Sequence, residues 1–357
     1  MLRSPLVASH QKQPEILSSG AGLAAAAAAE TGTELGEFQQ VRARGYWEQV
    51  WTRFRRDKVA IAGGFYIIIL LLIAFVGAPI ASHFLGHGPN TLFFDGVDET
   101  SLQPRGPGSW VTDPEHGNKE ILLLGADSTL GRDEFLRLLY GARVSLIVGG
   151  FATALSMLIG VLLGAIAGYY RGWIDTVVSR VTEITMAFPV LLFIIALAST
   201  VGDRLAQITL GGLFPPGVLT LVLVIGIFGW FYPARIIRAV VLSLREKEFI
   251  EAARMVGASD WRIIRSHLLP HLVAPIIVYS TLTIASVILI EAGLSFLGIG
   301  IKLPNASWGN MLSTGPEYYT TQPLLMVWPG MAVLFATLAF NLLGDGLRDA
   351  FDPRSSH

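Results

Sequence analysis

Three side chains could supply a hydrolytic pair: Ser295, in the sequence GLSF, and either His267 or His271. A serine nucleophile needs a histidine base within hydrogen-bonding reach. The residues between His271 and Ser295 are mostly apolar. If they form one helix, the two side chains lie roughly 36 Å apart, on opposite faces of a membrane. The spacing therefore does not support a serine hydrolase.

Motifs for nucleotide, metal and thiol chemistry are also missing from the sequence. It contains no G-x-x-x-x-G-K-[ST] phosphate loop, no H-E-x-x-H zinc motif and no G-x-S-x-G nucleophile turn. It has no cysteine, which excludes disulfides, thiol catalysis and cysteine-bound zinc. We expect the chain to be no enzyme and to hold no metal or cofactor of its own.

One compact charged segment, EFIEAARMVGASDWRIIRSHLLPH at residues 248–271, interrupts an otherwise apolar region. Its first residues are strong helix formers, and Gly257 suits the left-handed turn that ends a helix. Ser259 can cap a second helix, which should run to about Leu269, with the next segment beginning at Pro270. A helix with small residues beside charge can dock in a partner's groove. A solvated surface helix fits the same residues, so the pattern alone leaves both interpretations open.

The composition places this segment in a membrane protein. Of the 357 residues, 52% are hydrophobic and 15% are charged, whereas a soluble domain carries about 25% charge. The net charge of −1 gives no case for a nucleic-acid partner. A helical span needs about 20 apolar residues. Six runs meet this need: Val59–Ala81, Val144–Gly168, Ile184–Val201, Gly217–Ala234, Leu268–Ile290 and Pro323–Leu343.

The spans divide the chain into segments. We expect a disordered cytoplasmic tail at 1–45, an interfacial helix and the first span at 46–81, and an external loop at 82–143. A core at 144–348 contains the charged loop 245–270, and a short tail follows at 349–357. With the N-terminus inside, 19 of the 26 Lys and Arg residues lie on the inner side and 7 on the outer side. Because basic residues concentrate in the cytoplasm, both termini and the charged loop are predicted to be cytoplasmic.

Two further features concern the spans themselves. Gly160, Gly164 and Gly168 form a stripe that predicts close helix packing; a substrate path is the alternative. The 292–322 segment is rich in Gly, and we expect an ordered external loop that either stays outside or re-enters the membrane. The span cores lack Asp, Glu, Lys and Arg, and Glu291 stands only at an outer end. An ion-coupled carrier would have to rely on backbone oxygens, so this rival class is disfavoured.

The order of motifs in the charged loop resembles the EAA loop of ABC importer permeases. The matching positions are Glu251, Ala252, Ala253, Gly257, Leu269 and Pro270. His267 departs from that pattern, which prefers Ile. Four other blocks resemble the oligopeptide, dipeptide and nickel permease family, and its C-type subunit in particular: LGRDEFLRLLYGARVSLIVG, GYYRGWIDTVVSRVTEITMAFP, EAGLSFLGIGIKLPNASWGNML and NLLGDGLRDAFDPR. The resemblance covers about residues 60–354, and GADSTLGRD is one residue longer than usual.

The resemblance implies an all-α membrane protein, a six-helix bundle of the type I ABC importer permease kind with cytoplasmic coupling helices. We call residues 245–270 the coupling loop. The resemblance assigns its contact with the ATPase to Glu251, Ala252, Ala253, Gly257, Ala258, Leu269 and Pro270. In the external GRD segment, Arg132 and Asp133 are expected to contact a solute-binding protein.

The implied function is the permease subunit of an ATP-driven importer of peptides or similar solutes in the bacterial plasma (inner) membrane. The implied partners are a second homologous permease, two ABC ATPase subunits that bind ATP and Mg²⁺, and an external binding protein. Importers of nickel chelates, glutathione or oligosaccharides are alternatives within the class. The ion-coupled secondary transporter is the alternative outside it.

Overall fold

Helices form the membrane-spanning part of the chain, because a helix satisfies its own backbone hydrogen bonds where lipid offers none. The structure is a computed structural model, and it describes residues 45–352 except 115, 206–207 and 209–213. The expected tail at 1–45 lies outside the described residues apart from Gly45.

The elements of the first half are α2 (Tyr46–Phe54), α3 (Lys58–Leu72), the π-helical turn η1 (Ile73–Gly77), α4 (Ala78–Leu85), the 3₁₀ turn η2 (Phe94–Gly96), β1 (Ser109–Thr112), β2 (Lys119–Leu122) and α5 (Glu134–Tyr170). Those of the second half are α6 (Gly172–Ala187), α7 (Val190–Leu205), α8 (Val218–Phe228), α9 (Phe231–Arg245), α10 (Glu248–Met255), α11 (Asp260–Ile263), the π-helical turn η3 (Ile264–Leu268), α12 (Leu269–Phe296), α13 (Trp308–Thr314), the 3₁₀ turn η4 (Gly315–Glu317) and α14 (Leu324–Phe351).

Within the described residues, five helical stretches are long and apolar enough to cross a membrane, and α6 with α7 makes a sixth if the bent pair is one span. The five stretches are Lys58–Leu85, Glu134–Tyr170, Val218–Arg245, Asp260–Phe296 and Leu324–Phe351. The prediction of an all-helical membrane protein is confirmed. Each of the six predicted spans falls on one of these stretches or on the bent pair.

The third predicted span, at 184–201, is not one straight helix. α6 ends at Ala187 and α7 begins at Val190, with an angle of 87° between the two helices. Pro189 explains the break, because it lacks an N–H and disfavours helical backbone in the residue before it. Phe188 is accordingly extended, with φ −85° and ψ 142°.

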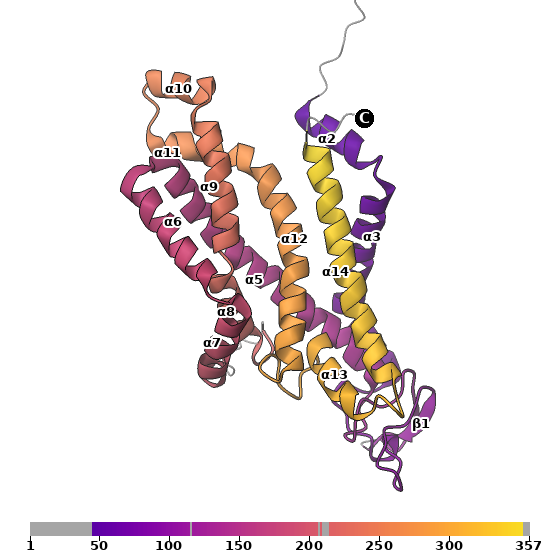
Figure 1. The fold of residues 1–357 in the computed structure, drawn as a ribbon. Coiled ribbons are helices and arrows are strands. Elements are labelled where there is room, and N and C mark those ends of the chain that lie inside the picture. Colours follow the sequence, from indigo (N-terminus) through magenta and orange to yellow (C-terminus); the bar gives the residue numbers. More distant parts are fainter. Residues whose placement is uncertain (1–44, 115, 206–207, 209–213, 353–357) are drawn as a thin grey trace, which may run out of the picture. The chain divides into compact units, whose positions relative to one another are not determined.

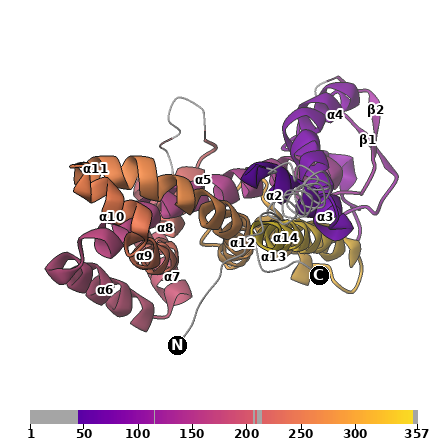
Figure 2. The ribbon, with the colours of Figure 1, turned by 90° about the horizontal axis from the view of Figure 1, so that it is seen from above.

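α5 is the longest described helix and packs against most of the others. Its 37 residues measure about 55 Å, which exceeds the roughly 30 Å of bilayer hydrocarbon. It runs obliquely past α8, α9 and α12 (Figures 1 and 2). α5 begins inside the expected loop 82–143, because Asp133 caps it by accepting hydrogen bonds from the amides of Phe135 (2.7 Å) and Leu136 (3.1 Å).

Buried apolar side chains form three helix-packing clusters, and α5 and α12 contribute to each of them. One cluster includes α7 and α8, a second includes α3, α13 and α14, and a third includes α9, α10 and α11. α5 and α12 therefore connect regions of the bundle that are distant in sequence.

The glycine stripe of α5 is a site of close helix packing. A Cβ added at Gly160 would lie 2.5 Å from the Pro233 Cβ, and one at Gly164 would lie 2.5 Å from the Ala234 backbone oxygen. At Gly168 the nearest backbone oxygen of α9 would be 2.9 Å away. The prediction of helix packing, rather than a substrate path, is confirmed for this stripe.

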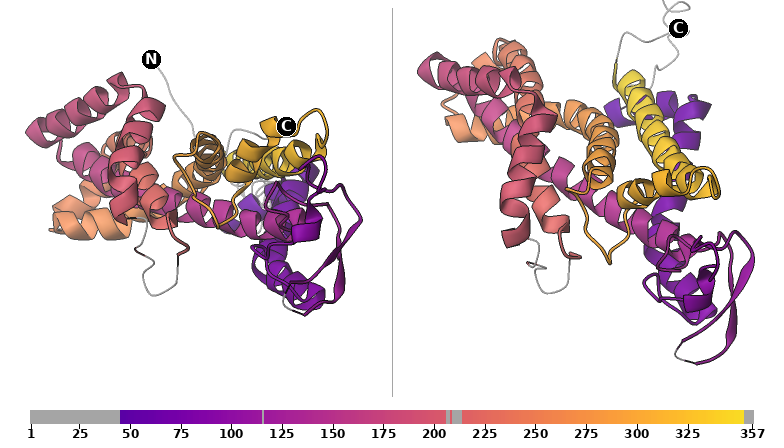
Figure 3. Two further views of the ribbon diagram at one scale, coloured as in Figure 1. Left: turned by 90° about the horizontal axis from the view of Figure 1, so that it is seen from below. Right: turned by 60° about the horizontal axis from the view of Figure 1, so that its bottom comes forward.

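The two ends of the bundle carry different structures. α10 and α11 lie at the same end as the last turn of α14, whereas the antiparallel β1–β2 hairpin and α13 lie at the other end (Figures 1 and 3). The hairpin covers a small apolar core made of Phe93, Val111, Leu122 and Ala126. The segment between α4 and α5 thus has ordered structure with a small apolar core of its own.

The stripe yields a matched pair of substitutions on α5. Gly164→Ala should destabilise the protein by about 1–3 kcal/mol, because the new methyl group meets α9 backbone that cannot move aside. Gly150→Ala should be neutral or slightly stabilising, since nothing lies within 4 Å of the added Cβ and Ala is the better helix former. Thermal unfolding in one detergent compares the two, and equal midpoints would contradict the packing assigned here.

Candidate functional site

The coupling loop folds as the sequence predicts up to its glycine. α10 has Glu248 and Glu251 in its first turn and Arg254 in its last, which complements the helix dipole. Gly257 then has φ +84°, and its N–H donates to the Arg254 carbonyl oxygen at 2.9 Å. No atom would meet an added Cβ there, so a side chain at Gly257 would be costly for backbone reasons alone. The predicted left-handed turn is confirmed.

The second short helix differs from its prediction in two ways. Ser259 has the extended backbone of an N-cap, yet its hydroxyl makes no hydrogen bond to the described backbone amides of α11. α11 also continues through η3 into α12 as one helical stretch. The prediction of a separate second helix that ends near Leu269 was therefore wrong. The π-helical turn just before Pro270 lets the chain stay helical where the missing proline N–H would otherwise interrupt it.

The inner face of the coupling loop is anchored in the bundle. Ile250, Ile263 and Leu268 are fully buried and pack in the cluster that α5, α9 and α12 share. Ala253 and Ala258 are half-buried against the same cluster. Burial of a large aliphatic side chain contributes about 1.5–3 kcal/mol, so the loop is held firmly.

Polar contacts of Tyr169, which we call the Tyr169 latch, add to this apolar packing. The Tyr169 hydroxyl at the end of α5 donates to Asp260 Oδ1 at 2.6 Å. The guanidinium groups of Arg254 and Arg245 lie 5.4 and 6.0 Å from the centre of the Tyr169 ring, within cation–π range. Tyr169 itself is buried. One side chain of α5 thus touches α9, α10 and α11.

The outer face of the coupling loop is exposed and mixed in character. Glu251 and Ala252 are exposed, and beside them Met255, Val256 and Trp261 are 82%, 89% and 69% exposed. Several large exposed apolar side chains on one short loop are typical of an interaction site. The exposure of these three side chains was not predicted from the sequence, although Met255 and Val256 directly precede the turn at Gly257.

Leu269 and Pro270 complete the residues expected at this site. Both are exposed at the start of α12, on the same loop but after the exposed apolar group. Of the seven expected coupling residues, Glu251 and Ala252 are exposed on α10, Ala253 and Ala258 are half-buried against the bundle, and Leu269 and Pro270 begin α12.

At the opposite end, Arg132 and Asp133 are buried in an ion-pair cluster. Arg132 Nε lies 3.0 Å from Asp127 Oδ2, and Arg137 Nε is also 3.0 Å from that oxygen. Asp133 caps α5 and bonds His87 Nε2 at 2.9 Å. Since Arg132 is 3% exposed and Asp133 is 0% exposed, we expect them to shape the external segment rather than to offer a surface.

His87 ties this cluster to the hairpin. Its Nδ1 is paired with the Glu120 carboxylate, and its ring packs edge-on against Phe93 at 4.9 Å. Burial alone would lower the pKa of His87, but the hydrogen bond and charge of Asp133, with the charge of Glu120, outweigh it and raise that pKa. The folded external segment thus favours a protonated His87.

Two known protein families match parts of this chain. The family described as "Binding-protein-dependent transport system inner membrane component" matches residues 160–357. The one described as "N-terminal TM domain of oligopeptide transport permease C" matches residues 45–98.

Two curated relatives are similar over most of their length. The glutathione transport system permease protein GsiD of Pectobacterium atrosepticum is 37% identical over 86% of this chain and 91% of its own. The dipeptide transport system permease protein DppC of Bacillus subtilis is 36% identical over 87% and 86%. Among solved structures, an inward-facing MetNI methionine ABC transporter chain gives a TM-score of 0.48 at 18% identity, covering 61% of this chain and 97% of its own.

The Tyr169 latch predicts an energetic link between Tyr169 and Asp260. Tyr169→Phe keeps the ring but removes the hydrogen bond, and should cost about 1 kcal/mol in thermal unfolding. Combined with Asp260→Asn, the loss should be less than additive, because both changes remove one interaction. Tyr170→Phe, on the neighbouring exposed ring, is the control and should change little. Fully additive effects would show that the hydroxyl and the carboxylate do not interact.

The raised pKa of His87 predicts that the external segment loosens as pH rises. A group whose pKa is raised on folding stabilises the fold below its unfolded value of about 6.5, and this stabilisation is lost as pH rises through the folded value. Maleimide labelling of Ala126→Cys, in the buried core, should therefore accelerate towards alkaline pH relative to labelling of the exposed Thr112→Cys. In a His87→Gln background this relative change should largely vanish. A pH response that survived His87→Gln would assign it to another group.

Proposed function

This chain belongs to the family of binding-protein-dependent transport system inner membrane components, and we propose that it imports short peptides or related solutes such as glutathione. It is a permease subunit of an ABC importer and not an enzyme. The proposed substrates follow from its relatives, which are named for dipeptide and glutathione transport. Nickel chelates and oligosaccharides are alternative substrates, and a direct assay of their uptake would detect their transport.

The observation that carries the mechanism is the two-sided construction of the coupling loop. Its inner face is anchored by Ile250, Ile263 and Leu268, while its outer face presents Glu251 and an exposed apolar group. A short helix of this kind fits a groove in a partner. We assign that partner to an ATPase subunit, which would hold the ATP and Mg²⁺.

In this mechanism, closure of the ATPases moves α10, and the motion enters the bundle through two connections. α10 follows α9 directly, and α9 packs on the glycine stripe of α5. Tyr169 provides the second connection, from the loop to the end of α5. Because both routes reach α5, a displacement of the loop would tilt α5 rather than bend the loop alone.

The assembly proposed around this chain has a second permease, two ATPases and an external binding protein. The coupling loop and the end of α14 share one end of the bundle, and we place that end in the cytoplasm because its loops are rich in Arg and Lys. The hairpin end then faces the binding protein. Phe94 and Trp110, which are 83% and 60% exposed there, are better placed for that contact than the buried Arg132 and Asp133.

The coupling loop can be tested by two substitutions in the reconstituted complex. Gly257→Val forces a β-branched residue to positive φ, at about 1–3 kcal/mol of strain, and Glu251→Lys reverses an exposed charge. Both should leave insertion and pairing intact but abolish most uptake and the stimulation of ATP turnover by loaded binding protein. Glu99→Lys, on the exposed external segment, should leave both near wild type.

Three results would decide against this function. Wild-type stimulation and uptake in both loop variants would make the loop an ordinary solvated segment. Labelling of Ser259→Cys by an impermeant reagent outside intact cells would invert the orientation. Uptake driven by an ion gradient without ATP would place the chain in the ion-coupled class instead.

A further inference from the structure

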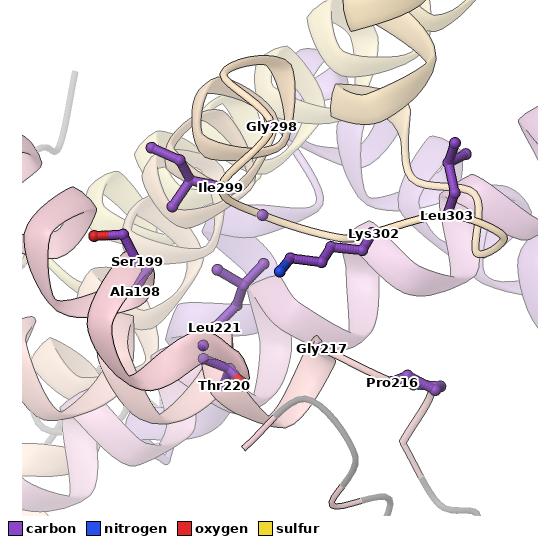
Figure 4. A pocket seen from close by; sticks show the side chains of 12 residues that line it. Ala198, Ser199, Pro216, Gly217, Thr220, Leu221, Gly298, Ile299, Lys302 and Leu303 are labelled. Carbon is purple, nitrogen blue, oxygen red and sulfur yellow. The ribbon is translucent and has the colours of Figure 1, made fainter. Parts of the chain in front are cut away.

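A pocket of about 440 Å³ lies between the first third of α5 and the chain segments 89–90, 214–216 and 305–306. Pro216 also lines a second pocket, of about 210 Å³, which is bounded by α7, α8 and the 298–303 loop (Figure 4). Of these two, the larger pocket alone has a wall on α5. That wall lies toward the hairpin end of the bundle, where α5 begins (Figure 1).

Arg143 carries the only charge among the described lining residues of the larger pocket. Its side chain is exposed and makes no ion pair within the described part of the chain, and its guanidinium lies 5.6 Å from the centre of the Phe75 ring in η1. Arg143 directly precedes the predicted span Val144–Gly168, which places it at the edge of the membrane hydrocarbon. A charge at that depth requires water or a counter-ion beside it, and the planar guanidinium matches the oxygens of a phosphate.

The lining of this pocket changes from polar to apolar. Tyr140 is half-buried one turn from Arg143, and its hydroxyl has no hydrogen-bond partner among the described residues. Val144, Ile147 and Phe214 are buried and form the apolar part of the wall. A ligand that fills the pocket is therefore polar at one end and apolar at the other.

The apolar part of the wall continues along α5 as an exposed strip. Phe151 packs edge-on against Phe214 at 5.1 Å between ring centres. Phe151, Leu158 and Leu162 follow one another at helical spacing and are 49%, 59% and 53% exposed. From Ile147 to Leu162 the strip measures about 22 Å, more than the roughly 15 Å depth of one hydrocarbon leaflet. A dipeptide extends only about 7 Å, whereas an acyl chain matches the strip in length and chemistry.

We propose that this pocket binds a phospholipid from the membrane leaflet at the hairpin end. Arg143 pairs with the phosphate, the Tyr140 hydroxyl donates to it, and one acyl chain lies on the strip of α5. The described lining residues include no carboxylate, so a headgroup ammonium finds no partner among them. The site therefore prefers an anionic headgroup such as phosphatidylglycerol to phosphatidylethanolamine. Such a site serves the permease whichever solute it imports.

Fluorescence quenching in the assembled complex detects this lipid, because the chain has no cysteine of its own. Phe151→Cys carries a bimane fluorophore on the strip, with cysteine-free partner subunits, in nanodiscs of phosphatidylethanolamine. At equal low mole fraction, brominated phosphatidylglycerol should quench about threefold more than brominated phosphatidylethanolamine, because it gains the charge-assisted pair with Arg143. At the control position Leu338→Cys on α14, which is 46% exposed, the two lipids should quench equally.

Variants then assign the preference to the two side chains. Arg143→Gln should abolish the preference for phosphatidylglycerol, while Arg143→Lys should keep most of it because the charge remains. Tyr140→Phe keeps the ring and every charge, and should reduce the preference by about half through loss of one hydrogen bond. Arg105→Gln, an exposed arginine of the external segment outside the pocket, should leave the preference unchanged.

Four results would overturn the lipid site. Equal quenching by the two lipids would make the strip an ordinary contact with bulk lipid. No quenching by either lipid would show that protein, such as the second permease, covers the strip. A preference that survived Arg143→Gln would belong to another cation. Relief of quenching by added alanyl-alanine would give the pocket to the solute instead.

Discussion

The close contact between α5 and α9 is the constraint on which the rest of the bundle depends. Three glycines, Gly160, Gly164 and Gly168, bring the two backbones so near that a Cβ would meet α9 at 2.5–2.9 Å. Lipid tails are as apolar as Leu, so helix association in a membrane relies on such packing. Because α9 leads directly into α10, the contact between α5 and α9 also fixes the position at which the coupling loop begins. The coupling loop is therefore the exposed end of a rigid unit formed by α5 and α9, and not a flexible connection.

α12 extends that unit to the opposite end of the molecule. It begins at the coupling loop, where Leu268 and Leu272 are buried with Tyr169. Near its other end, Glu291 is fully buried and accepts hydrogen bonds from Ser145 of α5 and from Ser295, both at 2.7 Å. The hydrogen bond between Ser145 and Glu291 is a second connection between α5 and α12. The two helices are thus connected at both ends, which favours their moving together. From the sequence, Glu291 was predicted only to lie at the outer end of a span.

Hydrophobic runs and turn residues predicted the helical content, the six spans and the turn at Gly257, because these depend on local sequence. Features set by packing were harder to predict. Pro189 indicated an interruption, but not the 87° angle between α6 and α7. Arg132 and Asp133 were expected to face a partner, yet ion pairing buries them. The exposure of Met255, Val256 and Trp261 was not predicted. It depends on which face of the loop packs against the bundle, and burial of Ile250 and Ile263 determines that face.

The link between the two ends places a requirement on the energetics. The 298–303 loop lies directly after α12, so a displacement of α12 would move that loop relative to α7 and α8. A bound solute and a docked ATPase can influence each other only if each has a different affinity for the two arrangements of the bundle. That coupling free energy must be reciprocal. ATP-driven movement of the coupling loop would then weaken solute binding by the same factor with which the solute opposes that movement. A permease that bound the solute with equal affinity in both states would contribute nothing to the direction of transport.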